Sequence, residues 1–153
     1  MKGAPRRTAA PPSAAPKPSL LIDTGVLVAL FDRLDAFHAS VTAWAAQNHD
    51  AWLTVAPVLC EAAHFLPARQ RAALAGLTDR GVIQVQAPDA AGHARIAGLF
   101  DKYADVDPDW ADLELVWLAE HTGIHRIATL DVADFSVYRI GGRRRFELEL
   151  LSR

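Results

Sequence analysis

The chain of 153 residues has a single cysteine, Cys60, so it cannot form an intramolecular disulfide. Chains without disulfides are typical of reducing compartments, and we therefore expect a cytoplasmic protein. Cys60 stands in an apolar run with no neighbouring base, so we interpret it as a packed core residue and not as a nucleophile. No apolar run approaches the ~18 residues of a membrane span. The basic residues Lys2, Arg6 and Arg7 are not followed by the apolar segment of a secretory signal.

Zinc motifs and phosphate-binding loops are also missing. There is no cysteine–histidine cluster and no glycine-rich phosphate loop. None of the histidines has the spacing of a zinc site: His38, His49, His64, His93, His121 and His125. If the chain binds a metal ion, its carboxylates favour Mg²⁺, with Mn²⁺ as the alternative.

Positive charge is scarce outside the first 17 residues. That segment carries four basic side chains and no acid, which leaves 12 basic and 18 acidic side chains in the remainder. An acidic body does not indicate a general nucleic-acid binder. Acids gather between residues 101 and 114, and four arginines gather at Arg139, Arg143, Arg144 and Arg145. An acidic centre with a basic rim suits a metal site that handles a polyanion, but a solvated surface with random charge patches fits equally well.

The composition divides the chain into two parts. Residues 1–18 are rich in Ala, Pro and Arg and predict a flexible extension, and residues 19–153 predict one globular domain. We expect strands at 20–22, 52–55, 82–85, 125–130 and 146–150. We expect helices at 26–31, 36–47, 57–66, 67–80, 89–103 and 110–121. Alternating strands and helices predict an α/β fold with a parallel sheet covered on both faces.

Two aspartates directly follow apolar strands. Asp23 follows Leu20-Leu21-Ile22, and Asp131 follows the strand that ends near Leu130. In open α/β sheets, ligands bind at the carboxyl ends of the strands, so both positions favour function. Either aspartate could instead cap the helix or turn that follows it.

Three further acids lie on predicted helices. Glu61 is the acid in an apolar helix that has no Lys or Arg within one turn, so an ionised Glu61 requires a partner or a raised pKa. Asp109 and Asp112 have the spacing of a helix N-cap and an acid in the first turn. For Asp112 alone, a site and a structural role are equally supported.

Four segments together resemble the PIN-domain ribonucleases, in particular the VapC-type toxins of toxin–antitoxin pairs. They are LLIDTGVLVALFD, TVAPVLCEAAHFL, PDWADLELVWLAEHTG and IATLDVADFSVYR, and the resemblance covers about residues 20–151. It implies a three-layer α/β/α sandwich with a central parallel sheet. It also implies RNA cleavage, a cognate antitoxin as partner and a homodimer, with no membrane association.

The resemblance also implies the site residues. Asp23, Glu61, Asp112 and Asp131 match the acidic quartet that binds Mg²⁺ and carries out catalysis, whereas Asp134 falls outside it. Thr24, Asp109 and Thr129 match positions beside the metal. The arginines at 139–145 are candidates for contacts with the RNA backbone, and a solvated loop is the alternative.

Two other classes fit less well. A haloacid-dehalogenase-like phosphatase needs a second acid two residues after Asp23, where this chain has Gly25, and a receiver domain needs an acidic pair that is absent. A catalytically inactive PIN-like scaffold or binding module remains the main alternative to a nuclease.

Overall fold

Five parallel strands form the central sheet of the protein. The structure, a computed structural model, describes residues 16–149. The strands lie in the order β3-β2-β1-β4-β5, and all four neighbouring pairs are parallel. Their bounds are β1 Leu20–Ile22, β2 Trp52–Thr54, β3 Ile83–Val85, β4 Arg126–Ala128 and β5 Glu147–Glu149. The α/β fold with a parallel sheet is therefore confirmed.

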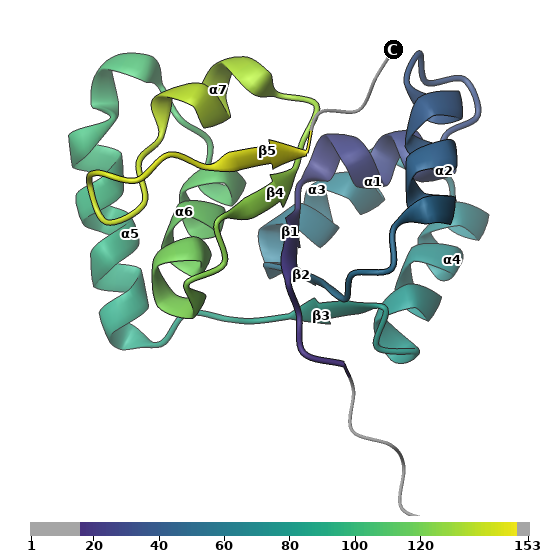
Figure 1. Cartoon of the computed structure of the whole chain (residues 1–153), viewed down its shortest axis with the longest axis horizontal. Coiled ribbons are helices and arrows are strands. Elements are labelled where there is room, and N and C mark those ends of the chain that lie inside the picture. Colours follow the sequence, from purple (N-terminus) through teal and green to yellow (C-terminus); the bar gives the residue numbers. More distant parts are fainter. Residues whose placement is uncertain (1–15, 150–153) are drawn as a thin grey trace, which may run out of the picture.

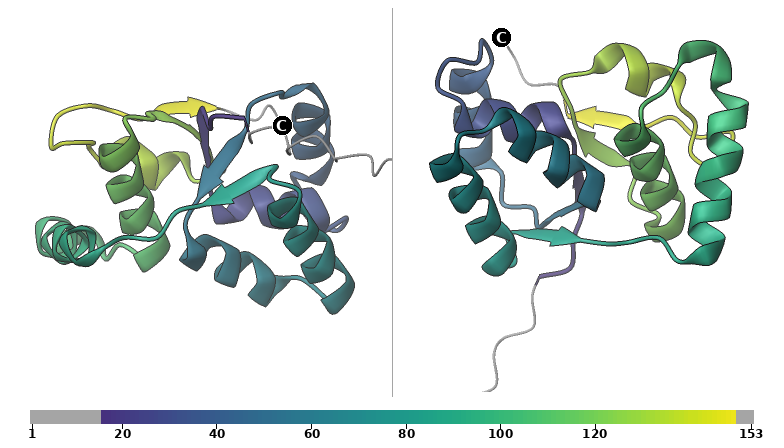
Figure 2. Two further views of the ribbon diagram at one scale, coloured as in Figure 1. Left: turned by 90° about the horizontal axis from the view of Figure 1, so that it is seen from below. Right: turned by 180° about the vertical axis from the view of Figure 1, so that it is seen from behind.

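Seven α-helices connect the described strands. They are α1 Thr24–Phe31, α2 His38–Gln47, α3 Ala56–Phe65, α4 Ala68–Asp79, α5 Ala90–Lys102, α6 Trp110–Thr122 and α7 Val132–Val137. Figure 1 shows α5 and α6 at one end of the sheet and α2 and α4 at the other, with α1 near the middle. The two views of Figure 2 show that α3, α4, α5 and α6 lie behind the sheet of Figure 1. Trp44 of α2 stacks on Trp52 of β2.

Helix α6 lies at the centre of the core. Its residues Ala111–Ala119 are buried without interruption. The helix begins where the Asp109 side chain accepts a hydrogen bond from the Asp112 backbone N–H at 2.8 Å, as a good N-cap does. It ends at Gly123, whose φ of 75° is the left-handed conformation that glycine adopts without strain. These caps hold Asp112 at a fixed position in the first turn.

The predicted elements are present, with shifts of a few residues at their ends. Helix α1 begins at Thr24 instead of Val26, because Asp23 ends the strand and caps the helix at once. We missed α7, where we expected only a turn, and also the 3-10 turn Ala104–Val106. Helix α7 has only six residues, which is too short for a clear helical period in sequence.

The prediction for Cys60 was wrong, because its side chain is exposed. Helix α3 buries Val58 and Ala62, which lie one turn apart on the same face. Cys60 lies midway between them in sequence and therefore points away from that face. The helix that appears apolar in sequence is therefore buried on one face only.

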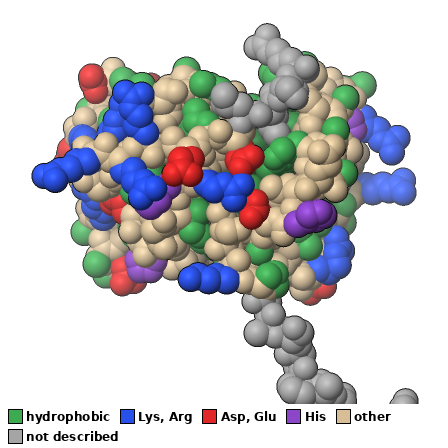
Figure 3. Space-filling view, viewed as in Figure 1, with side chains coloured by type: hydrophobic (Ala, Val, Ile, Leu, Met, Phe, Trp, Pro, Cys, Tyr) green, Lys and Arg blue, Asp and Glu red, His purple; other side chains and the backbone are tan. Residues whose placement is uncertain are grey.

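The face of the sheet that points toward the viewer in Figure 1 carries paired charges. Arg126 of β4 pairs with Glu149 of β5 and with Asp50 at 3.2 Å, and Figure 3 shows acidic and basic side chains interspersed in the middle of this face. Gln84 of β3 donates a hydrogen bond to the Pro16 carbonyl at 2.7 Å. Most of the extension expected at 1–18, together with Leu150 of the last expected strand, lies outside the described residues. No helix within residues 16–149 is long and apolar enough to cross a membrane.

Candidate functional site

A cavity of about 640 Å³ opens at the carboxyl ends of β1 and β4. Six residues proposed for the site from sequence line it together, and they come from four separate segments: Asp23, Thr24, Glu61, Asp109, Asp112 and Asp131. Gly25, Leu130, Val132 and Ala133 complete the lining, and none of the lining residues is basic. The fold therefore brings all four acids of the quartet to one place.

Asp23 is held from both sides. It is 7% exposed, and its two carboxylate oxygens accept hydrogen bonds from the Thr24 backbone N–H at 2.6 Å and from the Thr129 hydroxyl at 2.8 Å. Asp23 therefore caps α1 and lines the cavity at the same time, so the capping interpretation and the functional one are compatible. Thr129 does not line the cavity, but it joins the end of β4 to that of β1 through this bond.

Glu61 has a partner that its own helix could not supply. The Thr24 hydroxyl donates a hydrogen bond to its Oε2 at 3.0 Å. Thr24 belongs to α1 and Glu61 to α3, so this contact fixes the carboxylate of one helix against the N-terminus of another. The side chain is half-buried, and the Thr24 hydroxyl is its hydrogen-bond partner in place of a cation.

Asp112 is a buried carboxylate in the first turn of α6. The Tyr138 hydroxyl donates a hydrogen bond to its Oδ2 at 3.1 Å, and burial raises the pKa of Tyr138 well above its ordinary value, so it stays a donor. Asp109, the N-cap residue, lies beside Asp112 in the same cavity.

Asp131 repeats the arrangement of Asp23 on the neighbouring strand. It caps α7, and its carboxylate accepts a hydrogen bond from the Asp134 backbone N–H at 3.0 Å. The Thr129 hydroxyl, which donates to Asp23, accepts a hydrogen bond from the Asp131 backbone N–H at 2.9 Å. Asp131 is exposed, so it forms the rim of the cavity, whereas Asp134 is not among the lining residues.

Crowded carboxylates raise one another's pKa in this cavity. Burial, followed by the charges of Asp109 and Asp23, raises the pKa of Asp112 to about 8. Burial raises the pKa of Asp23 to about 6 despite its two hydrogen bonds, and Asp109 and Asp131 add to the rise. Burial also raises the pKa of Glu61 above its ordinary value. The cavity therefore holds negative charge at a cost, and a cation would relieve it.

The donor set fits a hard divalent cation. Every titratable side chain in the lining is a carboxylate, and carboxylate oxygens are the ligands of Mg²⁺ and Mn²⁺. Across residues 16–149, no three His, Cys, Asp or Glu side chains are arranged to hold an ion by protein atoms alone. The acids would hold Mg²⁺ partly through water, because Mg²⁺ usually keeps several waters and binds directly to one or two carboxylates.

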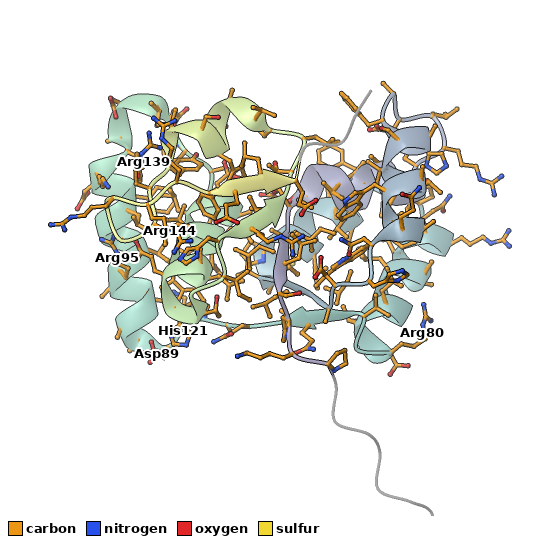
Figure 4. The ribbon with its side chains drawn as sticks, in the orientation of Figure 1. Arg80, Asp89, Arg95, His121, Arg139 and Arg144 are labelled. Atoms are coloured by element: carbon orange, nitrogen blue, oxygen red, sulfur yellow. The ribbon has the colours of Figure 1, made fainter. Side chains whose placement is uncertain are left out.

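Tyr138 is the contact to the acids that sequence reasoning missed. It lies 26 residues after Asp112 and no pattern links the two positions. The predicted arginine cluster lies elsewhere, because none of its members lines the cavity. The Arg139 guanidinium donates to the carbonyls at the end of α7, and Arg144 pairs with Glu147 at 3.3 Å; Figure 4 shows both arginines at the α5 end of the molecule.

Comparisons with known proteins agree with the fold. The crystal structure of VapC20 from Mycobacterium tuberculosis, described as a sarcin-ricin loop cleaving toxin, is similar with a TM-score of 0.64 and 18% sequence identity. The match covers 71% of this chain and 87% of that chain. At this identity the likeness shows the fold alone. No curated protein matches the sequence.

The family is shown by a sequence match over most of the chain. The model of the PIN domain family matches residues 20–140, which include every acid that lines the cavity. The chain therefore belongs to the PIN-domain family.

Proposed function

We propose that the protein is a metal-dependent endoribonuclease that hydrolyses RNA phosphodiester bonds, with Asp23, Glu61, Asp112 and Asp131 as metal ligands. The observation that carries this proposal is the convergence of these acids in one cavity without a basic residue. PIN-domain nucleases use divalent metal ions, and we infer Mg²⁺ here. A bound divalent cation would supply Lewis-acid chemistry at a phosphate and activate water for attack.

The residues of the chain then have separate tasks. Asp23 and Asp112 are buried and fixed by hydrogen bonds from Thr129 and Tyr138, so they form the rigid floor of the site. Glu61 is held by Thr24, and Asp131 lies at the exposed rim where RNA would enter. Attack by water in line with the leaving 3′-oxygen breaks the P–O3′ bond. The expected products carry a 5′-phosphate and a 3′-hydroxyl.

The biological part of the proposal is a toxin of a toxin–antitoxin pair that acts in the cytoplasm as a homodimer. Its support is family membership together with the fold likeness to a VapC toxin. A small open reading frame next to the gene, whose product relieves growth arrest and binds this chain, would support it. If expression of the active enzyme leaves growth unchanged, the toxin assignment is wrong.

The nuclease is tested by RNA cleavage with the purified full chain. We expect cleavage with Mg²⁺ or Mn²⁺, none in EDTA, and a loss of about 10²-fold or more in kcat for Asp23→Asn, because a metal ligand is removed. Asp101→Asn changes an exposed acid on α5 outside the cavity and should cleave at the wild-type rate. If neither metal supports cleavage, the chain is an inactive PIN scaffold. If Asp23→Asn cleaves as fast as wild type, the protein is a nuclease but the proposed metal site is wrong.

A further inference from the structure

A second pocket, of about 620 Å³, lies between α1, α2 and α4. We call it the Arg33/Arg69 pocket, after the two exposed arginines that border it from the α1–α2 loop and from α4. His38, Thr42 and Gln70 add polar groups, and Leu30, Phe31 and Ala73 complete the lining. No acid lines this pocket, so its charge is opposite to that of the carboxylate cavity.

The two arginines have no partner within residues 16–149, in the sense that neither forms an ion pair or a side-chain hydrogen bond there. Arg80, Arg143 and Arg145 form none there either, but none of these three lines the pocket. Arg95, Arg126 and Arg71 are engaged, with Glu120, with Glu149 and with the Leu66 carbonyl. The acids nearest to Arg33 in sequence form hydrogen bonds to other groups. Asp32 and Asp35 accept hydrogen bonds from the backbone of their own loop.

The shape and chemistry of the pocket favour a phosphate group. Guanidinium groups bind phosphate oxygens through paired N–H donors, and they match that planar geometry better than a lysine does. The His38 Nδ1 is bonded to the Ala29 carbonyl at 2.8 Å, which fixes the ring at the pocket wall. The two unpaired guanidinium groups, with no acid among the lining residues, therefore form a candidate site for an anion.

Helix α1 connects the pocket to the carboxylate cavity. Thr24, its first residue, lines the cavity, and Phe31, its last, lines the pocket. Seven residues of α-helix span about 10 Å. A strand of a few nucleotides that binds in the cavity could thus extend to the pocket.

We propose that the Arg33/Arg69 pocket binds a backbone phosphate of single-stranded RNA, a few nucleotides from the bond that is cleaved. This inference rests on the proposed function, because it takes RNA as the substrate. The carboxylate cavity has no basic residue, and this pocket would supply the positive charge that binds RNA. Contacts with phosphate carry no sequence information, so the pocket would set the register of the strand and not its sequence.

The test compares two arginines at opposite ends of one helix. Arg69 lies in the first turn of α4, and Arg80, which does not line the pocket, caps its other end and is labelled at the right of Figure 4. Binding of a fluorescent single-stranded RNA to the full chain in EDTA is measured against salt concentration. We expect the slope of log K against log salt to fall by about 0.7 for Arg69→Gln and about 1.4 for Arg33→Gln with Arg69→Gln. Arg80→Gln and the charge-preserving Arg33→Lys with Arg69→Lys should keep the wild-type slope.

The proposal for the pocket and the proposal of nuclease activity can be rejected independently. With Mg²⁺, the double Gln variant should raise KM several-fold with little change in kcat, because binding away from the reacting bond is lost. An unchanged salt slope in an enzyme that cleaves RNA would overturn the pocket alone. A changed slope in a protein that cleaves nothing would support the pocket and reject the nuclease. If a polyglutamate peptide binds as tightly as RNA and loses affinity equally in the variant, the pocket recognises protein carboxylates and the proposal is wrong.

Discussion

At the scale of single residues, Asp112 is a buried carboxylate whose ionisation destabilises the folded protein. Its carboxylate is buried at the N-terminus of α6, where the helix dipole favours its charge. The charges of Asp109 and Asp23 act against it and, with burial, raise its pKa to about 8. An ionised Asp112 therefore destabilises the fold, and our proposal explains this cost by metal binding.

We predict that Asp112→Asn stabilises the metal-free protein while it removes cleavage. The amide keeps an oxygen that can accept the Tyr138 hydrogen bond, and it removes a charge that its neighbours disfavour. Each pKa unit corresponds to about 1.4 kcal/mol, so a gain of roughly 1–2 kcal/mol is expected at pH about 8. Urea denaturation in EDTA measures it, with Asp101→Asn as the control. A loss of stability would show that Asp112 serves the fold.

At the scale of elements, the packing of α5 on α6 leaves no space at one glycine. A Cβ at Gly92 would lie 2.8 Å from Trp117 Nε1 and 2.7 Å from Pro88 Cβ. Gly98, on the same helix, has no atom within 4 Å of the same position. Gly92 therefore allows α5 and α6 to approach closely, whereas Gly98 contributes nothing to this contact.

We expect the two glycines to respond in opposite directions to alanine. Gly92→Ala should destabilise the protein by about 1–3 kcal/mol, because buried groups must move apart. Gly98→Ala should stabilise it by about 0.5–1 kcal/mol, since alanine is the better helix former at an open position. Thermal unfolding of both variants measures the contrast. Equal effects would mean that α5 is free to shift away from α6.

At the scale of the whole molecule, the strand order places β1 and β4 side by side in the middle of the sheet. Their carboxyl ends deliver Asp23 and Asp131 to one cavity, and α3 and α6 supply Glu61 and Asp112 from behind the sheet. The stability of the whole chain is therefore coupled to the ionisation of the cavity.

This coupling predicts how pH and metal act on folding. The pKa values of Asp23, about 6, and Asp112, about 8, both exceed the ordinary value of 3.8. Between pH about 4 and 8 the folded state holds protons that the unfolded state has released, so the free energy of unfolding falls as pH rises. The favourable contribution is complete below pH about 4.

Added Mg²⁺ should offset this loss, and more strongly at pH about 8 than at pH about 5, where protons compete for the same carboxylates. At a hundredfold excess over Kd, the gain is about 2.7 kcal/mol. Urea denaturation at both pH values, with Mg²⁺ and with EDTA, measures it. The Asp112→Asn variant isolates the contribution of Asp112. If its pH dependence equals that of the wild type, ionisation of Asp112 does not control stability.

Much of the site could be predicted because its signals are local. Asp23 and Asp131 stand where apolar strands end, and Asp109 stands three residues before the acid that it helps to place. The order of the four segments was enough to indicate the family before any contact was known. Helix ends were predicted to within a few residues, because N-cap residues and C-terminal glycines mark them locally in the sequence.

By itself, then, the sequence determined the alternation of strands and helices and the candidate acids. Only the tertiary structure decided which side chains meet. Thr24 reaches Glu61 across 37 residues, and Tyr138 reaches Asp112 across 26. It also decided that Cys60 faces outward and that Arg33 and Arg69 border one pocket. These contacts depend on how helices pack against one another, and a periodic pattern shows that a helix has a buried face without showing what lies against it.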